Sequence, residues 1–452
     1  MSHNVIEKQA LQKITPNKEY DTNLHQIIKE LEGKLLGEIQ KRKLPANVQL
    51  VGSMAKDTYL KDNLDIDFFL CYPTSHSKEK IAKNTLEIGK KLLKDTEESY
   101  AEHPYIRGIF KGFKAEIVPC YQIEDASQKL SAVDRTPLHT KYVRENITTS
   151  QKSDIRLFKQ FLRGIGCYGA EAEIEGFSGY LCEILVIKYG SFKDLIEQAQ
   201  KWRTGKKLAI AEGDYPSFNT PLTFIDPVDP DRNVSSALSK DKFDLFIKAC
   251  KEYQKKPTIN FFFPNPIEPW PLDRVKLEME RNKSYFIGVS FSKPDIIDEN
   301  LYPQIRKTVK SLEDNLNRND FEIKDAEFHV GKKSIYIVIN TTDKPLSETM
   351  IHMGPPAKLK TNVKNFISKW ENNKKVVKGP YKQNNRYYVE IERQYRYIKD
   401  YLKKEFNNLS MGKSIERSVK TNYEILNLED LLIDDLRIFW TEYLDKKMSW
   451  ER

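Results

Sequence analysis

The stretch from Val51 to Tyr72 reads VGSMAKDTYLKDNLDIDFFLCY. Its second half alternates between polar and apolar side chains, which predicts a β-strand. Residues i and i+2 of a strand project from the same face, so Asp65 and Asp67 point together while the apolar residues beside them point into a core. Two adjacent carboxylates repel unless a cation lies between them, and buried acids are rarely left without a partner. The stretch therefore predicts a functional pair of acids on a buried strand.

The chemistry expected of this pair is metal and phosphate binding. A hard divalent ion such as Mg²⁺ takes carboxylate oxygens as ligands and usually holds substrate phosphates as well. Gly52 and Ser53, at the end of the preceding strand, offer backbone N–H groups and a hydroxyl to an anion. A solvated strand edge and an ordinary turn are the alternative interpretations, but the order of the two motifs favours a metal-plus-triphosphate site.

Length and composition point to a multidomain globular protein. With 452 residues, 39% hydrophobic and 31% charged, the chain is too long for one ordinary core. No run approaches the length of a membrane span, and no signal-peptide pattern is present, so we expect no membrane partner. The five cysteines are scattered without a C-x-x-C pair, which favours a reducing cytoplasm: Cys71, Cys120, Cys167, Cys182 and Cys250.

The positive charge is regional. The whole chain carries a formal net charge of +9, whereas Pro355–Lys420 contains 17 Lys and Arg against 6 Asp and Glu, a balance of +11, so the remainder sums to −2. Aromatic residues such as Trp370 and Tyr388 are interleaved with these cations. A charged helix face is the alternative, but a balance this uneven favours a nucleic-acid surface.

Periodicity predicts an α+β, multidomain fold. Residues 1–150 read as a mixed sheet with helices that carries the acidic site, and 151–260 as a helical central domain. The proline-rich stretch FFFPNPIEPWPLD marks the next boundary, after which 261–452 read as an α+β region with one or two subdomains. A third acid is expected from the hairpin RGIFKGFKAEIVPCYQI, where Glu116 would lie on an antiparallel neighbour of the Asp65–Asp67 strand.

Longer strings carry a family resemblance. The Gly-Ser turn, the D-x-D strand and the later acid resemble the DNA polymerase β nucleotidyltransferase superfamily. Six strings resemble more specifically the archaeal, class I CCA-adding tRNA nucleotidyltransferases: YAEHPYIRGIFKG, EIVPCY, SAVDRTPLHTKY, YGAEAEIEGFSGYLCEILVIKYGSF, DPVDPDRNVSSALS and HMGPP.

This resemblance implies an enzyme that adds or repairs the 3′-terminal CCA of tRNA from CTP and ATP, without a nucleic-acid template. It implies two-metal nucleotidyl transfer with Mg²⁺ that releases pyrophosphate, with Asp65, Asp67 and Glu116 as catalytic residues and metal ligands. The third acid is usually Asp in relatives, so Glu116 is a departure whose effect the sequence does not reveal.

The resemblance also implies binding residues. The triphosphate and base of the nucleotide would be contacted by Gly52, Ser53, Lys56, His139, Lys159, Tyr168 and Arg232. Lys56 stands where Arg is frequent, which keeps the charge but loses the bidentate fork. Core packing, a helix face or an ion pair is the alternative role for each of these side chains.

The tRNA acceptor stem and 3′ end would be contacted by a loop at HMGPP and by the cations after it: His352, Gly354, Lys358 and Lys360. A stiff structural turn is the alternative interpretation of Gly-Pro-Pro. A poly(A) polymerase-like transferase and a non-catalytic RNA-binding protein on a degenerate transferase fold stay open as rival functions. The sequence does not show how nucleotide choice switches from CTP to ATP, nor the oligomeric state. Homodimerisation through the C-terminal half is a hypothesis that no coiled-coil heptad supports.

Overall fold

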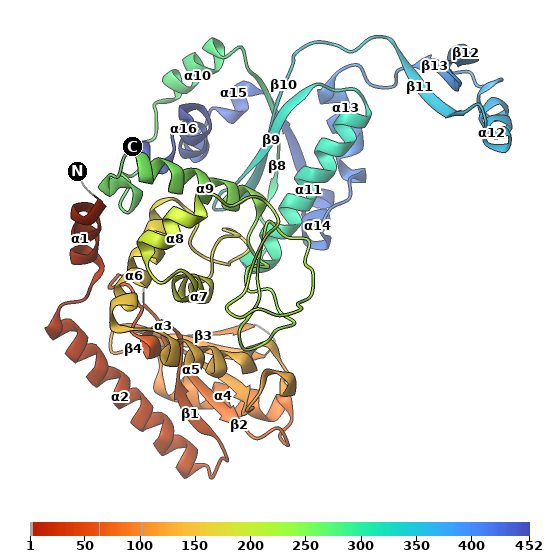
Figure 1. The fold of residues 1–452 in the computed structure, drawn as a ribbon. Coiled ribbons are helices and arrows are strands. Elements are labelled where there is room, and N and C mark those ends of the chain that lie inside the picture. The colour runs from red at the N-terminus through yellow and green to blue at the C-terminus, as the bar shows by residue number, and fades with distance from the viewer. Residues whose placement is uncertain (1–2, 63, 101–102) are drawn as a thin grey trace. The chain divides into compact units, whose positions relative to one another are not determined.

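A computed structural model describes residues 3–62, 64–100 and 103–452 (Figure 1). The chain divides into two compact units, Met1–Pro266 with Lys447–Arg452, and Ile267–Lys446. Helices and sheets occur in both units, which confirms the expected α+β class. The three expected domains, with their two boundaries, stay a prediction. Within the described ranges, no helix is both long and apolar enough to cross a membrane.

The amino-terminal part of the first unit is built on a five-stranded sheet with the order β1-β2-β5-β4-β3. The strands are β1 (Asn47–Leu50), β2 (Ile66–Tyr72), β3 (Lys94–Tyr100), β4 (Pro104–Phe110) and β5 (Phe113–Tyr121), and the helices are α2 (Lys18–Lys41), α3 (Gly52–Lys56) and α4 (Lys78–Leu92). The apolar stripes of α2 and α4, which include Leu31 and Ile88, share one core with Ile66 and Phe68 of β2.

The pairing of the central strand differs from the sequence-based expectation. We expected the strand with Glu116 to run antiparallel to the Asp65–Asp67 strand, but β2 and β5 are parallel. A parallel pair needs a long crossover connection, and the segment containing α4 and the antiparallel strands β3 and β4 supplies it. The parallel register sets Asp67 directly opposite Glu116.

The second part of the first unit is mainly helical. Its elements are α1 (His3–Ile14), α5 (Thr136–Asn146), α6 (Thr149–Gly164), α7 (Gly179–Tyr189), α8 (Phe192–Ala199) and α9 (Lys240–Lys255), with short strands β6 (Lys206–Leu208) and β7 (Leu222–Phe224). The SAVDRTPLHTKY string, expected to be a loop, forms a 3-10 turn at Ala132–Arg135 followed by α5. A proline in the first turn favours this helix start because its missing N–H would have no partner there.

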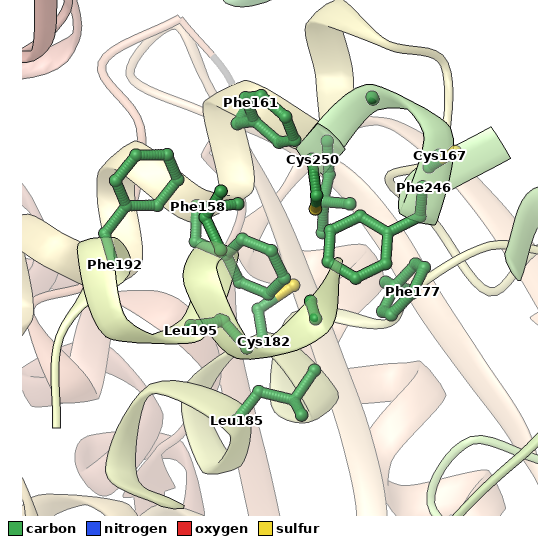
Figure 2. Close-up of a cluster of buried hydrophobic side chains, with 14 of the residues drawn as sticks. Phe158, Phe161, Cys167, Phe177, Cys182, Leu185, Phe192, Leu195, Phe246 and Cys250 are labelled. Carbon is green, nitrogen blue, oxygen red and sulfur yellow. The ribbon is translucent and has the colours of Figure 1, made fainter. Parts of the chain in front are cut away.

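An aromatic core holds the helical part together (Figure 2). Phe158 and Phe177 pack edge to face, and Phe246 packs on both rings. Residues distant in sequence complete this core, because Ile6 of α1 and Trp450 belong to it. Trp450 stacks on Phe261 with ring centroids 5.1 Å apart.

The second unit contains a four-stranded sheet with the order β14-β8-β10-β9. Its elements are α10 (Leu272–Arg281), β8 (Tyr285–Ser292), α11 (Asp298–Arg318), β9 (Ile323–Val330), β10 (Ser334–Thr341), α13 (Ile398–Glu405), α14 (Lys413–Thr421), β14 (Tyr423–Leu426), α15 (Leu428–Leu431) and α16 (Arg437–Asp445). Alternation along β8 buries Ile287 with Leu301 of α11 in one core and Phe286 with Trp440 of α16 in another. The sheet is therefore covered on both faces.

A second, three-stranded sheet with the order β11-β13-β12 lies within the basic part of the chain. Its strands are β11 (Thr349–Pro356), β12 (Val376–Gln383) and β13 (Arg386–Glu392), and α12 (Lys360–Trp370) packs with them. The HMGPP string, expected to be a loop or turn, is part of β11. Its backbone pairs with β13, and the register shifts between Met353 and Pro356, next to the two prolines.

Candidate active site

Two of the three expected catalytic acids lie side by side on neighbouring strands. Asp67 is the second residue of β2, and its register partner on β5 is Glu116. Asp65 lies one residue before β2 and is exposed. Asp65 and Glu116 line one cavity, which places Asp65 in the same group.

Mutual repulsion and burial shape the titration of these acids. Burial and the nearby charges of Glu116 and Asp65 raise the pKa of Asp67 from 3.8 to about 8. Burial also raises the pKa of Glu116, although Arg107 opposes that shift. An acid with a pKa this high is a functional-site signal, because a nearby cation favours its ionised form at neutral pH.

Glu116 is paired with a cation of the protein. Arg107 of β4 is its cross-strand neighbour and donates from Nε to Glu116 Oε1 over 2.5 Å. The Arg107 guanidinium also lies over the Tyr105 ring at 5.1 Å. Asp65, Glu116 and Arg107 line a cavity of about 400 Å³. Glu116 thus points towards Arg107 and lines a cavity that solvent can enter.

The donor set is chemically suited to a hard metal ion. Three carboxylates on or beside adjacent strands supply only oxygen ligands, which Mg²⁺ prefers. As the side chains stand, no three acidic, histidine or cysteine residues in the described ranges are close enough to hold an ion. Glu116 would therefore have to exchange Arg107 for the ion, and Arg107 is free to turn away because half of its side chain is exposed.

Gly52 is required by its contact with Asp67. A Cβ on Gly52 would lie 2.0 Å from Asp67 Oδ2, and the residue has a φ of +69°, which other residues rarely adopt. The Val51 N–H also donates to the Asp67 carbonyl over 2.9 Å. Gly52 and Ser53 begin α3, so their N–H groups lie at a helix start beside the acids. The Gly-Ser turn and the acidic strand therefore belong to one site.

Lys56 and Lys159 converge on an acid that the sequence analysis did not single out. Glu183 of α7 accepts from Lys56 Nζ over 2.5 Å and from Lys159 Nζ over 3.0 Å. Thr58 Oγ1 donates to Glu183 Oε1 over 2.7 Å and accepts from Lys159. Both lysines and Glu183 are buried. Two ammonium groups against one carboxylate leave this cluster with one excess positive charge.

Burial and charge act in opposite directions on this cluster. Burial by itself raises the pKa of Glu183, but the charges of Lys159 and Lys56 lower it to about 2. Burial lowers the pKa of Lys56, and Glu183 opposes that shift. Asp67 is also among the charges that act on Lys56, so the lysine cluster and the acidic site belong to one electrostatic group.

His139 and Arg232 meet at a second unexpected acid. Asp226 Oδ2 accepts from His139 Nε2 and from Arg232 NH1, each over 2.8 Å. Tyr180 donates to Asp226 Oδ1 over 3.0 Å and stacks on the His139 ring, with centroids 4.0 Å apart. The structure therefore brings His139 and Arg232 together.

Tyr168 lies near Lys159 at the start of α7. A Cβ on Gly179 would lie 3.3 Å from the Tyr168 hydroxyl and 3.9 Å from Lys159 Nζ, so this glycine leaves room for both side chains. Burial raises the pKa of Tyr168. The ring packs against the aromatic core, and its role in binding stays a prediction.

The expected tRNA contacts lie at β11 and the start of α12. His352 stacks on Phe366 with centroids 6.0 Å apart, and a Cβ on Gly354 would lie 2.7 Å from the same ring. Both residues thus have a structural role in holding α12. Lys358 and Lys360 are exposed.

One signal in the sequence could have revealed Glu183. The segment GYLCEILVIKY is apolar almost throughout, and a lone acid in such a helix is buried and needs a charged partner. Asp226 carried no comparable signal, because aspartates in a DPVDPDRN loop are typical turn residues.

Three family models match successive parts of the chain. They are described as nucleotidyltransferase domain for residues 32–139, as tRNA nucleotidyltransferase, second domain, for 153–263, and as CCA-adding enzyme, C-terminal domain, for 282–427.

Curated relatives match over nearly their whole length. The CCA-adding enzyme of Methanosarcina acetivorans is 36% identical over 96% of this chain and 97% of its own. The CCA-adding enzyme of Archaeoglobus fulgidus is 34% identical over 94% of this chain and 95% of its own. Among solved structures, E. coli MS115-1 CdnC with ATP covers 58% of this chain and 95% of its own, at 18% identity and a TM-score of 0.45, which is too weak to add to the family assignment.

Proposed function

The chain belongs to the CCA-adding enzymes and is a CCA tRNA nucleotidyltransferase, and on this premise we propose that Asp65, Asp67 and Glu116 form its catalytic centre. The observation that carries this assignment is the register of β2 and β5, which sets Asp67 opposite Glu116. Gly52 packs directly on the Asp67 carboxylate, so the start of α3 and the acids act on the same substrate group.

We propose Mg²⁺ as the metal, held by Asp65, Asp67 and Glu116. The chemistry that it supplies when bound is activation of the tRNA 3′-hydroxyl and neutralisation of the triphosphate. The hydroxyl gives up its proton to solvent as its oxygen attacks the α-phosphorus of CTP or ATP in line, the P–O bond to the leaving group breaks, and pyrophosphate departs. Release of Glu116 from Arg107 would free its carboxylate to turn towards the ion.

The triphosphate side is assigned to α3 and the lysine cluster. Ser53 offers its hydroxyl and N–H beside Asp67, and the excess positive charge of Lys56 and Lys159 over Glu183 suits a polyanion. Arg232 keeps a partly exposed guanidinium with N–H groups that complement acceptors on a base edge. His139 and Tyr168 complete the proposed nucleotide contacts.

The tRNA side is assigned to the basic segment of the second unit. Lys358 and Lys360 are exposed where β11 leads into α12, and they begin the stretch with a charge balance of +11 between Pro355 and Lys420. Phosphate neutralisation requires such exposed cations. His352 and Gly354 would act by holding the strand and helix that present these lysines.

We propose a cytoplasmic location because all five cysteines are free and buried. The sulfur atoms of Cys71 and Cys120 lie 3.2 Å apart without a bond between them, as expected in a reducing compartment. Homodimerisation stays a hypothesis, which multi-angle light scattering tests.

The deciding experiment uses the full chain with tRNA transcripts that lack A, CA or CCA, together with labelled CTP and ATP. We expect addition that stops after CCA. An adenylate tail would instead support a poly(A) polymerase-like activity. If the wild type and Asp67→Ala were both inactive, the result would support a non-catalytic RNA-binding protein.

A further inference from the structure

The Asp226 carboxylate lies at the centre of a network of four hydrogen bonds. Asp226 lies two residues after β7, its side chain is fully buried, and it begins a loop whose ends are joined to each other. The Asp226 N–H donates to the Arg232 carbonyl over 3.0 Å, and Ile225 forms an isolated bridge with Asn233. The loop from 226 to 232 is therefore closed at its base, with the Asp226 carboxylate inside it.

Four groups donate hydrogen bonds to the Asp226 carboxylate. Oδ1 accepts from the Tyr180 hydroxyl over 3.0 Å and from the Val228 N–H over 3.1 Å, while Oδ2 accepts from His139 and Arg232. A carboxylate offers about four acceptor positions, so all of them are in use. Burial raises the pKa of Asp226, but the hydrogen bonds from His139, Val228 and Arg232 help to lower the value to about 2. The group is an acceptor only.

This acceptor determines the protonation of His139. Because ionised Asp226 has no proton to donate, His139 Nε2 must carry the hydrogen of their 2.8 Å bond. The neutral ring then presents Nδ1 as an acceptor. Burial lowers the pKa of His139, although Asp226 opposes that shift, and the stacked Tyr180 ring holds the imidazole plane.

The same oxygen also determines how Arg232 lies. Its NH1 is held at Oδ2, and 30% of its side chain stays exposed. In the described parts of the chain no second acid pairs with this guanidinium, so its remaining N–H groups are available to a ligand. Since His139 and Arg232 share one acceptor atom, a displacement of Asp226 disturbs both together.

We propose that Asp226 is a positioning residue for nucleotide selection, which fixes the Nε2–H tautomer of His139 and the direction of the Arg232 guanidinium. This inference rests on the proposed function, in which both residues contact the incoming nucleotide. Selection between bases depends on donors and acceptors held in fixed places, because a misplaced or rotating group accepts a wrong base as readily as the right one. Asp226 itself touches no substrate.

A second acid in the loop provides a matched control. Asp229 is buried and accepts from Arg135 NH1 over 2.7 Å and from Lys129 Nζ over 2.9 Å. Its side chain anchors the same loop and bonds neither His139 nor Arg232, and its backbone carbonyl, which accepts from the Arg232 N–H over 2.9 Å, is unchanged in Asp229→Asn. Asp231 lies between Asp229 and Arg232 in the sequence, and its side chain is exposed. Asp229→Asn therefore reports loop anchoring alone, and Asp231→Asn reports the loss of one surface charge.

The test variant is Asp226→Asn, which keeps the shape of the side chain but replaces one carboxylate oxygen by an NH₂ group. This NH₂ group then faces the two donors that the oxygen accepted from. We expect the ratio of kcat/KM for CTP over UTP to fall at least 10-fold on a tRNA awaiting C, with KM for CTP rising more than kcat falls. Asp229→Asn and Asp231→Asn should keep the ratio within about twofold. Thermal unfolding of each variant checks that the fold is retained, and Asp226→Glu should recover part of the selectivity.

A readout independent of activity is the histidine tautomer. In ¹⁵N spectra of the full chain, we expect His139, assigned through His139→Gln, to be the Nε2–H form in the wild type and mixed in Asp226→Asn. An unchanged tautomer and selectivity in a folded Asp226→Asn would overturn the proposal, as would an equal loss of selectivity in Asp229→Asn. A wild type with the expected tautomer but no CCA addition would refute the proposed function and leave the Asp226–His139 contact standing.

Discussion

The substitution Glu183→Gln tests the buried lysine cluster most directly. It removes the one carboxylate that Lys56 and Lys159 share, while it keeps the size and one acceptor oxygen of the side chain. The pKa of Glu183 falls from 4.5 to about 2 on folding. This difference of about 2.5 units corresponds to roughly 3 kcal/mol at 1.36 kcal/mol per unit. Removing one partner of a buried pair costs about 3–5 kcal/mol in general, which agrees with this magnitude.

Hydrogen exchange followed by mass spectrometry at α7 measures this cost where it arises. We expect amides in the last turns of α7 to exchange roughly 100-fold faster in Glu183→Gln at pH 7, since each 1.36 kcal/mol is a factor of ten. Glu197→Gln, on the exposed face of α8, is the matched control and should leave this exchange unchanged. Adding Lys159→Met to Glu183→Gln should restore part of the protection, because one unpaired ammonium group is removed.

The pH dependence has a definite sign. The folded-state pKa of Glu183 lies below its unfolded value, so its contribution to stability is fully present above pH 4.5 and is lost as the pH falls towards about 2. The difference in free energy of unfolding between wild type and Glu183→Gln should therefore shrink between pH 4.5 and 3. A difference below about 1 kcal/mol at pH 7, or one that stays constant over this acid range, would refute the reasoning.

Three further predictions concern the acids and the basic segment. Asp65→Asn and Asp67→Asn should abolish nucleotide transfer and leave tRNA affinity in filter binding nearly intact. Because the pKa of Asp67 is raised to about 8, Asp67→Asn should also raise the Tm of the metal-free protein at pH 8. This gain in Tm should disappear at pH 4, where Asp67 is protonated in the folded wild type. Charge reversal of several lysines within 358–382 should weaken tRNA binding and flatten its salt dependence, and an unchanged salt slope would remove this region from the interface. Gly354→Val should displace Phe366, which a Cβ there would approach to 2.7 Å, and lower the stability of this region by about 1–3 kcal/mol in urea unfolding, whereas wild-type stability would contradict the packing.

The sequence was informative where function depends on neighbours in the chain. Alternation around Asp67 predicted a buried strand, and the structure places Ile66 and Phe68 in the core beside it. Ser178 stands directly before the apolar run of α7, a typical capping position, and its side chain accepts from the Leu181 N–H. Such local features depend on periodicity and capping, which a single sequence displays.

Pairings between distant segments were not predictable in the same way. The direction of β5 depends on how the chain crosses over after β2, and a hairpin pattern carries no information about that choice. Likewise Arg107 reads as one more surface cation until the register of β4 and β5 places it on Glu116. The three-stranded sheet was missed because prolines and glycine interrupt β11 and β12, which hides the strand period.

The aromatic core of the helical part has a consequence for modularity. Ile6 and Trp450 pack in the same core as residues 155–262, although more than 400 positions separate them. Contacts between such distant positions carry a large loop-closure entropy and slow the search for the native state. A fragment cut to the 153–263 segment would expose Phe261, on which Trp450 stacks, and would lose the core contribution of Ile6. We therefore expect this segment to behave as a dependent part of a larger folding unit rather than as a transferable domain.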